Sequence, residues 1–134
     1  MKISKIATAT QLTPEGIYTA HIVSISKGDV ISAPTSIVIT VKLLELDKIQ
    51  RIYVSTKKET AEDVSIWDRT VYDIYNQLNC TEDADSDDIE SCASLFHGKD
   101  VWTYCVHNQA QDGKTYTNFY FSKNNKVQAM LAFM

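Results

Sequence analysis

Residues 35–55 read TSIVITVKLLELDKIQRIYVS and contain two stretches in which apolar and polar side chains alternate. Alternation with a period of two is typical of β-strands that bury one face, so residues 35–46 and 49–55 are predicted to be strands. The Asp47-Lys48 step between them predicts a hairpin. On the earlier strand, one side carries Ile37, Ile39, Val41 and Leu43, and the other side carries Val38, Thr40 and Lys42.

The strand pattern extends toward the N-terminus of this hairpin. Residues 17–26 are rich in β-branched side chains and follow a turn predicted by the sequence Thr-Pro-Glu-Gly at residues 13–16. Residues 27–29 (Lys-Gly-Asp) end this run, and the Ala33-Pro34 step lies in the loop before the next strand. Three short strands in succession predict an antiparallel meander.

The period changes after residue 64. Trp67, Val71, Ile74 and Leu78 recur at i, i+4, i+7 and i+11, which predicts an amphipathic helix with one face on the core. Ser65 and Asp68 have the spacing of a capping box at the start of this helix. Asn79 is a residue type that often ends a helix.

Two further strands are predicted at residues 101–108 and 115–122, joined by a connection that contains Asp112-Gly113, a strong hairpin signal. The element order is therefore three strands, a helix and two strands. A five-stranded Greek-key barrel with one helix between its third and fourth strands, the OB fold, has this order. We therefore predict an all-β OB-fold barrel with one helix. An open α+β sandwich with the same element order is the alternative.

The chain has 134 residues, of which 44% are hydrophobic and 22% charged, with only four glycines and two prolines. This composition indicates one compact domain and excludes collagen-like, low-complexity and wholly disordered chains. We expect a flexible leader at residues 1–12, the OB-fold domain at residues 13–123 and a tail at residues 124–134.

Targeting and redox signals are few. No apolar run approaches the roughly 20 residues that cross a bilayer, so we expect no membrane association. The N-terminus has no apolar core of a secretory signal. The cysteines Cys80, Cys92 and Cys105 are odd in number and lack CxxC spacing, so we expect no disulfide framework and a cytoplasmic location.

The net charge of −4 is unevenly distributed, because six acidic residues lie within residues 82–90. Without them, 13 basic residues face 11 acidic ones, which leaves room for a mildly basic face elsewhere. We predict that residues 81–90 form a solvated loop. The competing hypothesis is a protein-interaction module, an inhibitor or adaptor, that acts through this acidic run or through the apolar tail.

Catalytic and metal signatures are absent from the sequence. It contains no GxSxG, P-loop, HExxH or GxGxxG motif. Cys92 and His97 lack the paired short spacing of zinc ligands. A calcium loop that starts at Asp83 fails at Asp88, where glycine is needed, and at Ser94, where glutamate is needed. We therefore predict a protein that is not an enzyme and that has no cofactor and no metal.

Exposed aromatic rings interleaved with basic side chains are typical of proteins that bind single-stranded nucleic acid. If Ile52 and Val54 face the core, Arg51 and Tyr53 point outward together. If Phe119 and Phe121 face the core, the tyrosines of the last strand point outward. The predicted nucleic-acid-binding residues are Lys42, Arg51, Tyr53, Lys57, Lys58, Lys114, Tyr116 and Tyr120.

Two segments make the chain resemble the OB-fold single-stranded DNA-binding proteins of bacteriophages. They are TPEGIYTAHIVSI at residues 13–25 and FHGKDVWTYCVHNQAQDGKTYTNFYF at residues 96–121. The resemblance implies sequence-independent binding of single-stranded DNA in replication or recombination, as a dimer or higher oligomer, with replication or recombination proteins as further partners. It implies base stacking on Tyr53, Tyr116 and Tyr120, and phosphate contacts from Lys42, Arg51 and Lys114.

The C-terminus departs from this resemblance. Bacterial relatives commonly end in an acidic tail that recruits replication enzymes, whereas residues 129–134 read AMLAFM. We therefore expect the tail to pack onto the barrel or onto another subunit.

Overall fold

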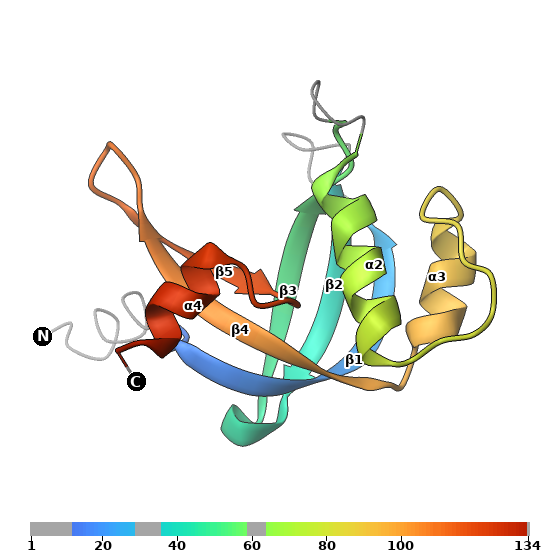
Figure 1. Cartoon of the computed structure of the whole chain (residues 1–134), viewed down its shortest axis with the longest axis horizontal. Coiled ribbons are helices and arrows are strands. Elements are labelled where there is room, and N and C mark those ends of the chain that lie inside the picture. Colours follow the sequence, from blue (N-terminus) through green and yellow to red (C-terminus); the bar gives the residue numbers. More distant parts are fainter. Residues whose placement is uncertain (1–11, 29–35, 59–63, 134) are drawn as a thin grey trace, which may run out of the picture.

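The computed structural model describes residues 12–28, 36–58 and 64–133, and its centre is a curled antiparallel sheet of five strands in the order β3-β2-β1-β4-β5 (Figure 1). The predicted leader, apart from Leu12, and the predicted loop around Pro34 lie outside the described residues. The elements are β1 (Gly16–Lys27), β2 (Ser36–Leu43), the 3-10 helix η1 (Leu44–Leu46), β3 (Lys48–Ser55), α2 (Ile66–Gln77), α3 (Ile89–Phe96), β4 (Asp100–Gln109), β5 (Thr115–Tyr120) and α4 (Asn125–Leu131).

The long strand β1 joins the two halves of the sheet. Its residues 16–21 pair with β4, and its residues 20–27 pair with β2, so that Ala20 has partners on both sides. The register shifts between Ile22 and Ser24. Such a bulge bends a strand and increases its twist, which accounts for the curl of the sheet at this point.

The curled sheet is open between β3 and β5. In the described part of the chain, β3 pairs only with β2 and β5 pairs only with β4. The predicted five strands and their antiparallel pairing are confirmed, and among the described residues the sheet forms a half-barrel that is open at this seam (Figure 1). The prediction of one helix between the third and fourth strands is corrected, because both α2 and α3 lie between β3 and β4 and α4 follows β5. At this seam the backbone carbonyl of Phe121, just after β5, accepts a hydrogen bond of 2.8 Å from Gln77 Nε2 of α2 and not one from β3.

The main core lies inside the curl of the sheet. The predicted inward sides of β2 and β3 are confirmed, since Ile39 and Val41 are fully buried and Ile52 and Val54 nearly so. Phe121 is buried in the same cluster, and Phe119 packs against it. From the helices, the core receives Trp67, Val71, Ile74, Cys92 and Phe96.

Helix α2 begins with the predicted capping box. The Ser65 side chain accepts from the Asp68 backbone N–H at 3.0 Å, and the Asp68 carboxylate accepts from the Ser65 backbone N–H at 2.9 Å. The carboxylate also accepts from Lys58 Nζ and from Ser86 Oγ, each at 2.5 Å. Burial raises the pKa of Asp68, but these hydrogen bonds outweigh it and hold the pKa well below its usual range.

The low pKa of Asp68 predicts a pH-dependent contribution to stability. We expect Asp68→Asn to lower the free energy of unfolding by about 1–2 kcal/mol at neutral pH, since it weakens a cap and removes a paired charge. Because the folded-state pKa is depressed, the contribution is present above the unfolded pKa of about 4 and is lost as the pH falls. The difference in free energy of unfolding between parent and variant should therefore shrink as the pH falls. Urea unfolding of both proteins between neutral pH and pH of about 3 measures this difference. Asp87→Asn is the control, and a difference that does not change with pH would contradict the prediction.

Helix α3 corrects the prediction of a solvated loop at residues 81–90, because the helix begins inside that segment. The side chain of Asp88 caps it by accepting from the Ser91 backbone N–H at 3.1 Å. Cys92 and Phe96 lie one turn apart and are both buried. The loop before α3 is anchored as well, because Trp67 Nε1 donates to the Ser86 carbonyl at 2.8 Å.

The tail forms helix α4, which the sequence analysis did not predict. Asn124 caps it by accepting from the Val127 backbone N–H at 2.9 Å. Val127 and Met130 pack on Tyr104 and Val106, on the face of β4 that points away from the main core. Of the two expectations for the tail, packing on the sheet is the one that the structure shows.

The end of β2 also differs from the prediction. The strand stops at Leu43, and residues 44–46 form a 3-10 helix before the chain turns at Asp47, which has a φ of 48°. Leu44 and Leu46 are exposed, so their apolar character does not continue the inward side of the strand. Among the described helices, none has the length and apolar character needed to cross a membrane.

Candidate nucleic-acid interface

The outer side of β3 presents two of the predicted binding residues next to each other. Arg51 and Tyr53 alternate with the buried Ile52 and Val54, so both point away from the core. Tyr53 is 53% exposed. None of the ion pairs in the described part of the chain involves Arg51. An exposed ring and a guanidinium group therefore lie two residues apart on an edge strand.

A groove of about 670 Å³ lies where β3 and β5 fail to pair, and we call it the seam groove. The edge residues of β3 and of β5 line it, and residues of α2 line it as well. Arg51, Tyr53 and Tyr120, three of the predicted residues, line it together. The full lining is residues 50–55 and 117–122, together with Ile66, Arg69, Thr70, Asp73 and Asn124.

Two of the predicted lysines are held in ion pairs. Lys42 Nζ lies 2.9 Å from Asp47 Oδ1, and Lys58 Nζ lies 2.5 Å from Asp68 Oδ2. The hydrogen bond from Lys42 also lowers the pKa of Asp47. A phosphate must compete with these carboxylates, so the two lysines are weaker candidates for phosphate contacts than Arg51.

The other predicted basic residues are exposed but lie at separate places. Lys57 lies two residues after the end of β3, and Lys114 lies in the hairpin between β4 and β5, which projects from the body of the molecule (Figure 1). Tyr116, at the start of β5, is 49% exposed. Lys114 and Tyr116 are close to each other in sequence on the projecting hairpin, and neither lines the seam groove, which β5 borders from Thr117 onward.

The structure corrects the expectation that Tyr120 is freely exposed. It is partly buried and packs against the cluster that α4 forms with Tyr104 and Val106. This contact does not follow from the strand pattern, because it depends on α4, which was not predicted. Tyr120 therefore lines the seam groove while part of its side chain is covered by the α4 cluster.

Trp102 is an exposed aromatic residue that the predicted set omits. It is 54% exposed on the outer side of β4. The side-chain amide of Gln77 holds its backbone, since Gln77 Nε2 donates to the Trp102 carbonyl at 2.9 Å and Trp102 N–H donates to Gln77 Oε1 at 2.7 Å. Alternation alone does not show which side of β4 faces the core, because both sides carry apolar residues. Tyr104 and Val106, on the same side as Trp102, are buried under α4.

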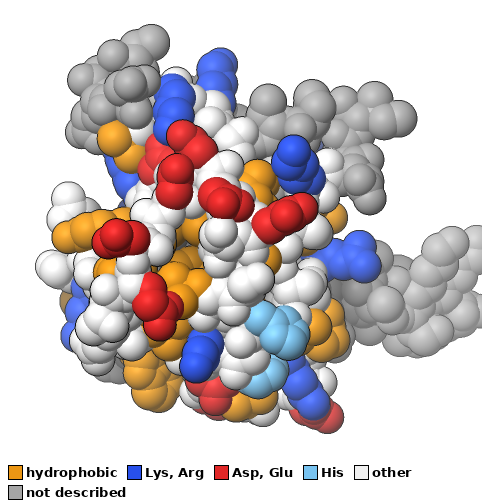
Figure 2. Space-filling view, turned by 90° about the vertical axis from the view of Figure 1, so that its right-hand side faces the viewer, with side chains coloured by type: hydrophobic (Ala, Val, Ile, Leu, Met, Phe, Trp, Pro, Cys, Tyr) orange, Lys and Arg blue, Asp and Glu red, His pale blue; other side chains and the backbone are white. Residues whose placement is uncertain are grey.

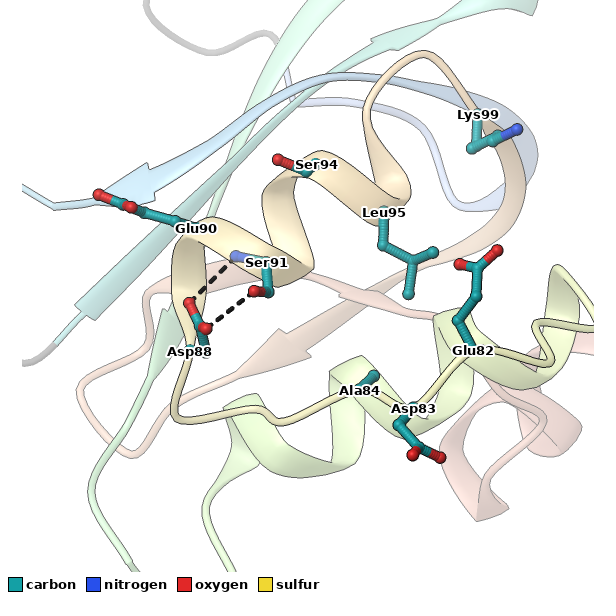
Figure 3. Close-up of a pocket in the computed structure, with 9 residues that line it drawn as sticks. All are labelled: Glu82, Asp83, Ala84, Asp88, Glu90, Ser91, Ser94, Leu95 and Lys99. Carbon is teal, nitrogen blue, oxygen red and sulfur yellow. Dashed lines mark hydrogen bonds between the residues drawn. The ribbon is translucent and has the colours of Figure 1, made fainter.

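Acidic side chains gather on the face that α3 and the loop before it cover (Figure 2). A shallow pocket on this face is lined by Glu82, Asp83, Asp88, Glu90 and a single base, Lys99 (Figure 3). Asp88 is occupied by its two hydrogen bonds to Ser91. The negative charge of this surface disfavours phosphate binding there.

The described residues show no cluster of three or more potential metal ligands. His21 Nδ1 lies 2.6 Å from Asp100 Oδ1, and His107 Nε2 lies 2.7 Å from the Thr13 carbonyl oxygen. Burial raises the pKa of Cys105 to about 11, so this thiol is protonated at neutral pH and is a poor nucleophile. The sequence matches no protein-family model, and a comparison with curated proteins finds no relative.

Proposed function

We propose that this protein binds single-stranded DNA through the outer side of β3 and the adjoining seam groove. The observation that carries the proposal is the exposed ring of Tyr53 beside Arg51, at the rim of a groove between two strand edges. A tyrosine ring stacks on any base, which makes such binding tolerant of sequence. A guanidinium group pairs with phosphate oxygens in a bidentate manner.

The strand arrangement supports the proposal. The sheet order β3-β2-β1-β4-β5 is consistent with an OB-like fold that is open at one seam, although α3 as well as α2 lies between β3 and β4. OB folds bind oligonucleotides on the face of strands two and three and on the bordering loops. Arg51 and Tyr53 lie on that face of this chain.

Binding to a labelled oligo-dT of about 30 nucleotides, followed by fluorescence anisotropy across a salt series, tests the proposal. Affinity should fall as salt rises, because each phosphate contact releases counterions. Duplex DNA of the same length should bind more weakly, because its bases are not free to stack on Tyr53. Absence of binding to the single strand at low salt would overturn the proposed function.

Arg51→Ala should weaken binding and reduce the salt dependence. Loss of one phosphate contact on a single strand lowers the slope of log affinity against log salt by about 0.7. Lys126→Ala is the matched control, because it removes one positive charge from an exposed position on α4. Equal effects of the two variants would show that only net charge matters and that Arg51 makes no specific contact.

A further inference from the structure

We propose that the seam groove holds one unstacked base of the bound strand, and that Asp73 selects a base with an exocyclic amino group. This inference rests on the proposed function and adds a base preference to it. The groove volume of about 670 Å³ lies within the range of ordinary small-ligand pockets, about 300–1,000 Å³.

The strand edges on both sides of the groove supply polar groups. In the described part of the chain, neither β3 nor β5 has a ladder partner on the groove side, so backbone N–H and C=O groups border it. Thr117 also lines the groove, and its hydroxyl oxygen is buried without a hydrogen-bond partner among the described residues. Buried polar atoms normally have partners, so a polar ligand in the groove would satisfy this one.

The groove is continuous with the proposed stacking surface. Arg51 and Tyr53 belong both to the outer side of β3 and to the groove lining. A strand that stacks one base on Tyr53 therefore passes the groove with its neighbouring base. Phe119, which is partly buried against the core, offers an apolar contact for a base that enters.

Asp73 gives the groove its chemical preference. An ionised carboxylate only accepts hydrogen bonds, and its side chain already accepts one from Ser122. Burial raises the pKa of Asp73, which is consistent with a position in a partly closed site. Carboxylates accept from the 4-amino group of cytosine, whereas thymine presents a carbonyl oxygen there and repels them.

Oligo-dC and oligo-dT of equal length make a matched pair of probes, because both are single-stranded pyrimidine chains. Anisotropy is measured at mildly alkaline pH, where cytosine does not self-associate through protonation. We expect the parent protein to bind oligo-dC more tightly by about fivefold or more. Asp73→Asn should abolish this ratio, because an amide both donates and accepts. Glu90→Gln on α3 should keep it.

The outcomes separate the two proposals. Binding of both probes with equal affinity by the parent protein, or a preference for oligo-dT, would overturn the base preference and leave the proposed function intact. A ratio that survives in Asp73→Asn would overturn the role of Asp73. Absence of binding to both probes would overturn the proposed function and this inference together. The parent ratio remains decisive even if Asp73→Asn does not fold.

Discussion

Phe96→Ala is expected to lower the free energy of unfolding by about 3–5 kcal/mol, the usual cost of removing a fully buried aromatic ring. Phe96 is the last residue of α3 and has an exposed fraction of 0% in the main core. The loss combines the transfer of the ring out of water with the cavity that remains. Urea unfolding followed by circular dichroism measures it.

Phe133→Ala is the matched control for this prediction, because Phe133 is 92% exposed near the C-terminus. Its effect should stay within about 0.5 kcal/mol, as for most surface substitutions. A domain of this size is stable by only about 5–15 kcal/mol, so Phe96→Ala should bring it close to unfolding. Similar small effects of both substitutions would show that α3 does not pack on the sheet as described.

Tyr53→Ala is expected to weaken binding of single-stranded DNA by about tenfold or more, because each stacked base contributes about 1–3 kcal/mol. The fold should remain intact, since the ring lies on the outer side of β3 and is 53% exposed. Anisotropy titration with oligo-dT at fixed low salt measures the change. Tyr53→Trp should retain binding, because it keeps a flat ring.

The control for Tyr53→Ala is Tyr72→Ala, which removes an exposed ring from α2, where Tyr72 is 67% exposed. This control should bind like the parent protein. If Tyr53→Ala also binds like the parent, the outer side of β3 is not the stacking surface. Equal losses in both variants would instead indicate a general effect of exposed aromatic rings.

The five strands and helix α2 could be predicted from the sequence, and so could the buried sides of β2 and β3. Ile39 and Ile52 are buried, whereas Arg51 and Tyr53 are exposed, as alternation predicts. The capping box at Ser65 was also predictable, because Ser65 and Asp68, the two residues that form it, lie within one turn of the helix.

Helices α3 and α4 could not be predicted in this way. They have eight and seven residues, and each buries only two side chains, too few to establish a period. Their stability comes from docking, of α3 through Phe96 and of α4 through Val127, and not from local helix propensity. The partial burial of Tyr120 could not be predicted either, because it depends on the packing of α4.

The local periods of the sequence determine which side chains of each strand and of α2 face inward, because side-chain direction follows from backbone geometry alone. Whether β3 and β5 pair, and which aromatic rings stay exposed, depends on contacts between distant segments. Gln77 reaches the Phe121 carbonyl across 44 residues of sequence, and Tyr120 meets α4 only after the chain has turned back on β4. Only the packed structure brings these groups within reach, and it thereby creates the seam groove.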